Sequence, residues 1–180
     1  GPNIIVHNSY LYFVVGYDLP LAIIDRYVLA NWIVQSVIVY MINCESEPEF
    51  GLYEVWKIVP LLIYNDLLFG FFHWIMHTYF PKSHAIHHRL KDEKLIRINA
   101  QSSSILDHCF TSLLPPYLSA ICAGLNYPFM VLWFVFCEYN SVKSHIFIDG
   151  DYNYHVIHHY DQRKHLGTSI GLFDYIMCSN

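Results

Sequence analysis

Residues 58–88 read IVPLLIYNDLLFGFFHWIMHTYFPKSHAIHH, and this stretch decides the fold. It joins an apolar run, long enough for a helix that spans a membrane, to two groups of histidines. His73 and His77 are four residues apart, and His84, His87 and His88 follow after a gap of six residues. Residues three and four apart share one face of a helix, so each group presents its imidazoles together.

A third group stands near the C-terminus, where His155, His158 and His159 repeat the spacing of the second group. A single histidine on an apolar helix is usually a packed core residue, but eight histidines in three same-face groups would require three separate coincidences. A structural zinc site needs four ligands, so eight imidazoles predict two metal ions. Imidazole alone does not choose among zinc, copper, iron and nickel. The first group lacks the glutamate of the HExxH zinc-protease motif, which disfavours peptide hydrolysis.

The composition indicates a membrane protein. The 180 residues suit one domain over 1–180, and only 14% of them are charged, against about 25% in a soluble domain. So few charged residues would not coat a soluble helical bundle. The net charge of −5 argues against nucleic-acid binding, and the five cysteines form no CxxC pair, which indicates reduced packing residues. The chain begins with Gly1-Pro2, as a trimmed sequence would, and no basic segment precedes an apolar one to indicate a cleavable signal peptide.

Four apolar stretches are candidate membrane spans: residues 21–41, 58–80, 105–125 and 128–142. Pro115 and Pro116 must break or kink the third. Residues 44–56 carry four glutamates and no Lys or Arg, whereas 81–104 carry five Lys or Arg residues. Positive residues stay on the cytoplasmic side, so both termini and 81–104 are predicted there, with all three histidine groups at one membrane face. The predicted fold is all-α: an integral-membrane bundle of about four transmembrane helices with a cytoplasmic histidine-rich di-metal cap.

The pattern HxxxH, HxxHH and HxxHH resembles the signature of the fatty acid hydroxylase/sterol desaturase superfamily, most clearly over residues 58–180. Asp66 and Asp107 stand where that family carries acidic residues, and His145 resembles its lone histidine before the last group. The stretch from His158-His159-Tyr160 through Leu166-Gly167 to Phe173-Asp174 is similar to its terminal motif. The resemblance implies nine metal ligands: His73, His77, His84, His87, His88, His145, His155, His158 and His159.

The resemblance also implies a function, an iron- and O2-dependent hydroxylase or desaturase acting on a sterol or fatty-acyl-type lipid. Two iron ions would bind the histidines, with zinc as a substitute, and Asp66 and Asp107 would accept hydrogen bonds from ligand imidazoles. Electrons would come from a cytochrome b5-type donor, because the chain has no nucleotide-binding fingerprint. Basic residues at 82–97 could dock an acidic donor of this kind. The expected location is the endoplasmic reticulum membrane, with the site on its cytoplasmic side.

Other readings stay open at this stage. They are a zinc-dependent membrane hydrolase, a metal transporter, and an inactive scaffold relative. A transporter would place its ligands near the bilayer midplane rather than at one face. The scaffold reading comes from Trp74, Ser104 and Ser141, which stand where family members usually carry Arg, the His of a His-Pro pair and a further His. His108 and His165 match no motif, and the sequence does not decide whether they join the site. It does not choose among sterol, fatty acyl chain, sphingolipid and carotenoid either.

Overall fold

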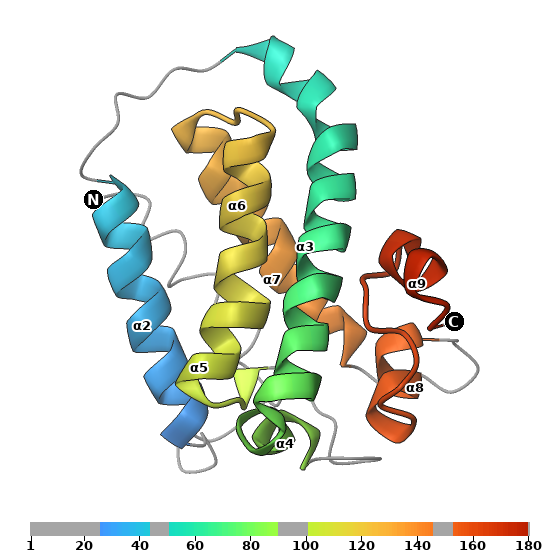
Figure 1. Cartoon of the computed structure of the whole chain (residues 1–180). Helices are drawn as coiled ribbons and strands as arrows, with labels where there is room; N and C mark the ends of the chain where they lie inside the picture. The colour runs from blue at the N-terminus through green and yellow to red at the C-terminus, as the bar shows by residue number, and fades with distance from the viewer. Residues whose placement is uncertain (1–25, 44–50, 90–100, 146–152, 180) are drawn as a thin grey trace.

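The computed structural model describes residues 26–43, 51–89, 101–145 and 153–179, and every regular element among them is helical (Figure 1). The prediction of an all-α fold is therefore confirmed for this part of the chain. Its elements are α2 (Arg26–Asn43), the 3-10 helix η3 (Leu52–Lys57), α3 (Ile58–Tyr79), α4 (Pro81–His88), α5 (Ile105–Asp107), the π-helix η6 (His108–Leu113), α6 (Leu114–Cys122), α7 (Tyr127–Ser144), α8 (Tyr154–Tyr160) and α9 (Leu172–Met177). Several predictions concern residues outside these ranges. They are the predictions for Gly1-Pro2, for a signal peptide and for the start of the first span. Most of the charged residues of the acidic and basic segments also lie outside the described residues.

The long helices form an antiparallel bundle in which α2, α3, α6 and α7 run alternately in opposite directions (Figure 1). Helix α3 packs against η6, α6 and α9, and α6 packs against α7. Because of this alternation, the C-terminal end of α3 lies at the same end of the bundle as α4 and α5, which is the lower end in Figure 1. Buried Leu61, Ala120, Leu125 and Trp133 form an apolar core that joins α3, α6 and α7 near the opposite end.

The predicted interruption of the third apolar stretch takes the form of the π-helix η6. Pro115 and Pro116 lie in the first turn of α6, where a helix does not need their missing N–H groups. One turn earlier, however, the carbonyls of Thr111 and Ser112 lose the donors that a continuous α-helix would supply from positions 115 and 116. The Leu114 N–H instead donates to the Cys109 carbonyl, five residues back, which is the hydrogen bond of a π-helix.

The bundle has an apolar outside and a partly polar inside. On α2, the side chains of Leu29, Ile33 and Val37 are each more than half exposed, while Asn31 and Gln35 on the other face are fully buried. Large apolar side chains are also exposed on α3, α6 and α7. A water-soluble bundle has the opposite arrangement. Within the described ranges, one helix, Tyr53–Tyr79, is long and apolar enough to cross a membrane.

Helix α9 approaches α3 closely because α3 carries a glycine at the contact. A Cβ added to Gly70 would overlap the ring of Phe173, which is buried there. Glycine is usually unfavourable inside a helix, so its position in α3 is explained by this approach. The contact holds the C-terminal segment beside the histidine-bearing end of α3.

We expect Gly70→Ala to lower the free energy of unfolding in detergent by about 1–3 kcal/mol, the usual cost of overpacking. Alanine in place of glycine within a helix ordinarily stabilises by about 0.5–1 kcal/mol, so the sign of the change is diagnostic. Chemical unfolding followed by circular dichroism measures it. The double variant Gly70→Ala/Phe173→Leu should recover part of the lost free energy of unfolding. A single variant as stable as the parent would show that Phe173 does not pack on Gly70.

Candidate metal centre

The nine histidines converge at one end of the bundle in two adjacent groups. Within each group, the nitrogen atoms that could bind a metal all lie within 4.8 Å of one another. The first group has five members: His73, His77, His84, His88 and His158. The second group has four members: His87, His145, His155 and His159. The groups share a border, since the rings of His88 and His159 have centroids 4.6 Å apart.

Helix periodicity explains how each HxxHH motif serves both groups. On α4, His84 and His88 are four residues apart and both join the first group, while His87 turns to the second. On α8 the assignment is reversed: His155 and His159 join the second group and His158 joins the first. Pro81 begins α4 directly after α3 ends at Tyr79, which places α4 across the end of the bundle.

The Nε2 atoms lie at the spacing expected of ligands around one ion. In the first group, the Nε2 of His84 is 3.0 Å from that of His73 and 2.9 Å from that of His88. In the second, the Nε2 of His145 is 2.9 Å from that of His155 and 3.1 Å from that of His87. Ligands about 2.1 Å from an ion stand about 3.0 Å apart in octahedral geometry and about 3.4 Å apart in tetrahedral geometry. The separations of the first group fit an ion with more than four ligands, whereas those of the second group, which include 3.5 Å between the Nε2 atoms of His87 and His155, span both geometries.

Four of the imidazoles have a defined tautomer because Nδ1 faces an atom that can only accept. The Nδ1 of His73 donates to the Leu166 carbonyl at 2.8 Å, and that of His84 donates to Asp107 Oδ1 at 2.8 Å. In the same way, His145 and His158 donate from Nδ1 to the carbonyls of Ser141 and Lys164, at 2.6 and 2.7 Å. Each of these rings, when neutral, presents a lone pair at Nε2.

The lone pairs of His73 and His84 thus face each other at 3.0 Å with no proton to share. This arrangement is repulsive unless a cation lies between the two nitrogens. Burial lowers the pKa of His158 to about 4 and lowers the pKa of His87 and His155 well below the ordinary value, so these three neighbouring rings are neutral. Neutral imidazole is the form that binds metals. The donor set therefore fits two metal ions, one in each group.

Asp107 has the contact predicted for it. Its Oδ1 accepts the hydrogen bond from His84, and Ser104 fixes the turn because its hydroxyl oxygen accepts from the Asp107 N–H at 3.2 Å. A carboxylate behind a ligand imidazole fixes the ring orientation and raises its basicity. Ser104 thereby serves as the N-cap of α5.

Asp66 differs from its prediction, since its carboxylate contacts backbone and not an imidazole. It accepts hydrogen bonds from the N–H groups of Thr168 and Phe173, each at 2.9 Å. The physical reason is distance: seven residues before His73 on the same helix face is about 10 Å along the axis. Asp66 acts indirectly, because it anchors the segment whose Leu166 carbonyl accepts from His73.

Asp174 is a site residue that the sequence reasoning did not assign. Its carboxylate accepts from the N–H groups of Leu166 at 2.6 Å and Gly167 at 3.1 Å, so it holds the other side of the same segment. Gly167 is required between the two carboxylates, because a Cβ there would lie 2.9 Å from Asp174 and 3.2 Å from Asp66. The signal in the sequence that could have identified Asp174 was its place in the terminal motif, which contains the pairs Leu166-Gly167 and Phe173-Asp174.

His108 and His165 join neither group. His108 is fully buried at the start of η6, and its ring nitrogens have no hydrogen-bond partner among the described residues. His165 has a positive φ of 54° and packs its ring on Tyr154, with centroids 4.9 Å apart. Its backbone N–H donates to the Ser179 carbonyl at 2.8 Å. This role is structural, and it makes His165 a suitable control in metal-binding experiments.

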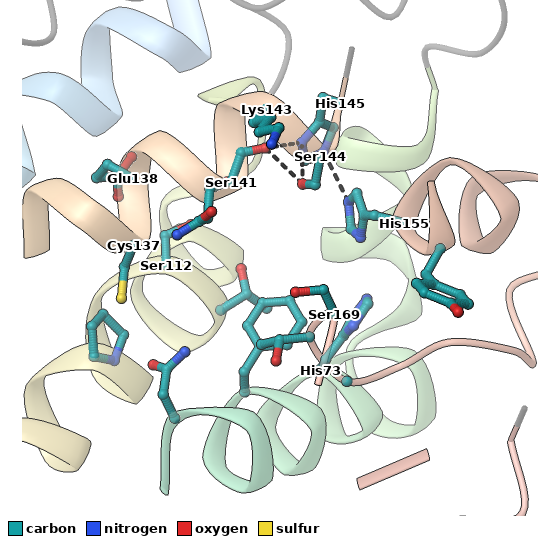
Figure 2. Close-up of a pocket in the computed structure, with 18 of the residues that line it drawn as sticks. His73, Ser112, Cys137, Glu138, Ser141, Lys143, Ser144, His145, His155 and Ser169 are labelled. Carbon is teal, nitrogen blue, oxygen red and sulfur yellow. Dashed lines mark hydrogen bonds between the residues drawn. The ribbon is translucent and has the colours of Figure 1, made fainter. Parts of the chain in front are cut away.

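A cavity of about 440 Å³ borders both histidine groups and extends between α3, η6, α6 and α7. Figure 2 shows His73, His145 and His155 on one side of it, with Cys137 and Glu138 on the other. Its volume lies within the range of small-molecule sites. The apolar part of the wall is contributed mainly by Leu62, Phe69, Pro116, Trp133 and Phe136.

Comparison with known proteins adds no relative to this description. No protein-family model, no curated protein and no solved structure matches the chain. The functional argument below therefore rests on the residues and geometry of the site.

We predict that the purified protein binds two metal ions and that each group can be emptied separately. His73→Ala and His145→Ala should each reduce the content from two ions to about one per chain, because each removes a ligand from one group only. Elemental analysis of the folded protein measures this. His165→Ala is the matched control and should retain two ions. Loss of both ions in each single variant would instead indicate one shared site.

Asp107→Asn should weaken metal binding at the first group by about 10–100-fold, the usual effect of removing a carboxylate behind a ligand histidine. The second group should be unaffected, because its rings do not contact Asp107 among the described residues. Competition with a chelator, monitored by metal release, separates the two affinities. Equal weakening at both groups would argue that Asp107 acts on the fold as a whole.

Proposed function

We propose that the chain is a membrane-bound non-haem di-iron oxygenase, of the fatty acid hydroxylase/sterol desaturase type, that hydroxylates or desaturates a lipid. The observation that carries this proposal is the pair of adjacent histidine groups on the wall of a partly apolar cavity. Two neighbouring metal ions beside an apolar substrate suit the oxidation of an unactivated C–H bond. Two iron ions, when bound, would supply the O2 activation that this reaction requires.

The ligand set supports iron over zinc as the working metal. The first group offers five imidazoles, whereas structural zinc sites are closed by four ligands and catalytic zinc sites use three. Zinc also has no redox chemistry, so a zinc-loaded protein would be inert as an oxygenase. Zinc can replace iron in a purified sample without any change of ligands, because imidazole suits both ions.

The chain's own residues position the substrate and exclude water from its reacting carbon. His73, His84, His87, His145 and His155 all contribute to the cavity wall, so a substrate in the cavity lies beside both groups. The Leu166 carbonyl and Asp107 hold two of these rings in orientation. Apolar side chains from α3, α6 and α7 line the remainder and exclude water from the reacting carbon.

The apolar exterior supports a four-span arrangement made by α2, α3, η6 with α6, and α7. Within the described ranges, only the helix Tyr53–Tyr79 is by itself both long enough and apolar enough to cross a membrane. The reason for the weaker signal elsewhere is the polar interior: α2 buries Asn31 and Gln35, and α7 buries Glu138, so their mean hydropathy falls while their outward faces stay apolar. In the proposed topology the histidine end is cytoplasmic, in the endoplasmic reticulum membrane, where a cytochrome b5-type donor could deliver electrons.

The test is an oxygen-dependent lipid assay with iron-loaded protein and a supplied reductant. Lipid extracts from a host with and without the protein identify the substrate. We expect His158→Ala to reduce hydroxylated or desaturated product to background, because it removes a ligand of the first group, while His165→Ala keeps parental turnover. The zinc-loaded protein should be inactive.

Three other results would contradict the proposal. Product formation by the zinc-loaded protein without O2 would identify a hydrolase. Metal movement across sealed vesicles would identify a transporter. Full iron loading with no oxidised product from any host lipid would identify a scaffold.

A further inference from the structure

One side chain that lines the cavity has a carbonyl oxygen without a hydrogen-bond partner among the described residues. Asn65 lines the cavity, and its side-chain Oδ1 is buried with no hydrogen-bond partner among the described residues. Asn65 lies within the helix that is apolar enough to cross a membrane. A polar side chain at membrane depth is costly and is usually functional. Its amide is therefore in a position where a ligand group, rather than solvent, would satisfy it.

The position of Asn65 along α3 relates it to the metal centre. Leu62, Asn65, Phe69 and His73 all line the cavity and follow one another at spacings of three and four residues, so they form one stripe of the helix. Asn65 precedes His73 by eight residues, which corresponds to about 12 Å along the axis. Asn65 thus lies about 12 Å along α3 from His73, toward the other end of the bundle.

The π-helix η6 borders the same cavity. Thr111 and Ser112 of η6 line it, and η6 packs against α3. The Thr111 carbonyl lacks helical donors at positions 115 and 116, because both are proline, and the N–H of Leu114 is used by Cys109. Such irregular backbone is tolerated at membrane depth where it lines a cavity. Figure 2 places Ser112 on the side of the cavity away from His155.

We propose that Asn65 determines substrate specificity by binding a hydroxyl group of the lipid, about 12 Å along the molecule from the carbon that is oxidised. A hydroxyl is a small neutral group whose O–H can donate to the unpartnered Oδ1 of Asn65. This inference rests on the proposed function, since it names the chemical class of that substrate. It makes Asn65 a positioning residue, because it fixes which carbon lies beside the histidines.

Binding to the zinc-loaded protein tests the inference apart from turnover, because zinc does not activate oxygen. The probes are tritiated dodecan-1-ol and, as its competitor, dodecane of the same chain length. We expect the parent protein to prefer the alcohol by about tenfold, the range of a net buried hydrogen bond. Asn65→Leu, which is close in size, should bind both probes equally, and Asn65→Gln should retain part of the preference.

Equal binding of alcohol and alkane by the parent, or no binding of either, would overturn the inference without any variant. An unchanged preference in Asn65→Leu would also overturn it. The proposed function fails separately: a hydroxyl preference that depends on Asn65, with no oxidised product from the iron-loaded protein, would retain the lipid site and remove the oxygenase. In an active enzyme, Asn65→Leu should raise KM for hydroxylated lipid and scatter the position of oxidation, which a purely structural role would not do.

Discussion

Nine imidazoles lie within two small volumes, and positive charge between their facing nitrogen atoms would stabilise this arrangement. The Nε2 atoms of His73 and His84 lie 3.0 Å apart while both rings use Nδ1 to donate elsewhere. Burial lowers the pKa of the neighbouring His158 to about 4, so that this ring is neutral and available to a metal ion. A bound cation would relieve the repulsion, and its affinity would then contribute directly to folding.

The remainder of the structure is arranged to present those rings. Asp66 and Asp174 clamp the segment around Gly167 from two sides, which places the Leu166 carbonyl behind His73. Because Gly70 has no Cβ, the ring of Phe173 packs directly against α3, and this contact holds the C-terminal segment beside that helix. The cavity then begins at the histidines and runs into the bundle, where its wall is partly apolar. In the proposed function, a metal pair at this end of the cavity would lie beside a lipid carbon from which the apolar wall excludes water.

Much of this could be predicted from the sequence because helix spacing dictates which side chains share a face. Helix spacing predicted that the members of each histidine group share a face, and loop charge predicted that the three groups meet at one end, where the structure places them. His145 and Asp107 were predicted only from the family resemblance, and the structure places His145 in the second group and Asp107 behind His84. Two features could not be predicted from it. Asp66 shares a face with His73 but lies two turns away, and its partners come from a backbone segment about a hundred residues later in the chain. The division of each HxxHH motif between two ions depends on how α4 and α8 pack together, which a local pattern does not contain.

X-ray absorption at the iron edge of the iron-loaded protein tests the central claim most directly. Nine histidines around two ions predict an average of four to five imidazoles per iron, in a shell at about 2.1 Å, with no sulfur ligand. The outer-shell scattering of the imidazole rings reports their number. One or two imidazoles per iron, or a sulfur ligand such as Cys137 of the cavity wall, would contradict the account.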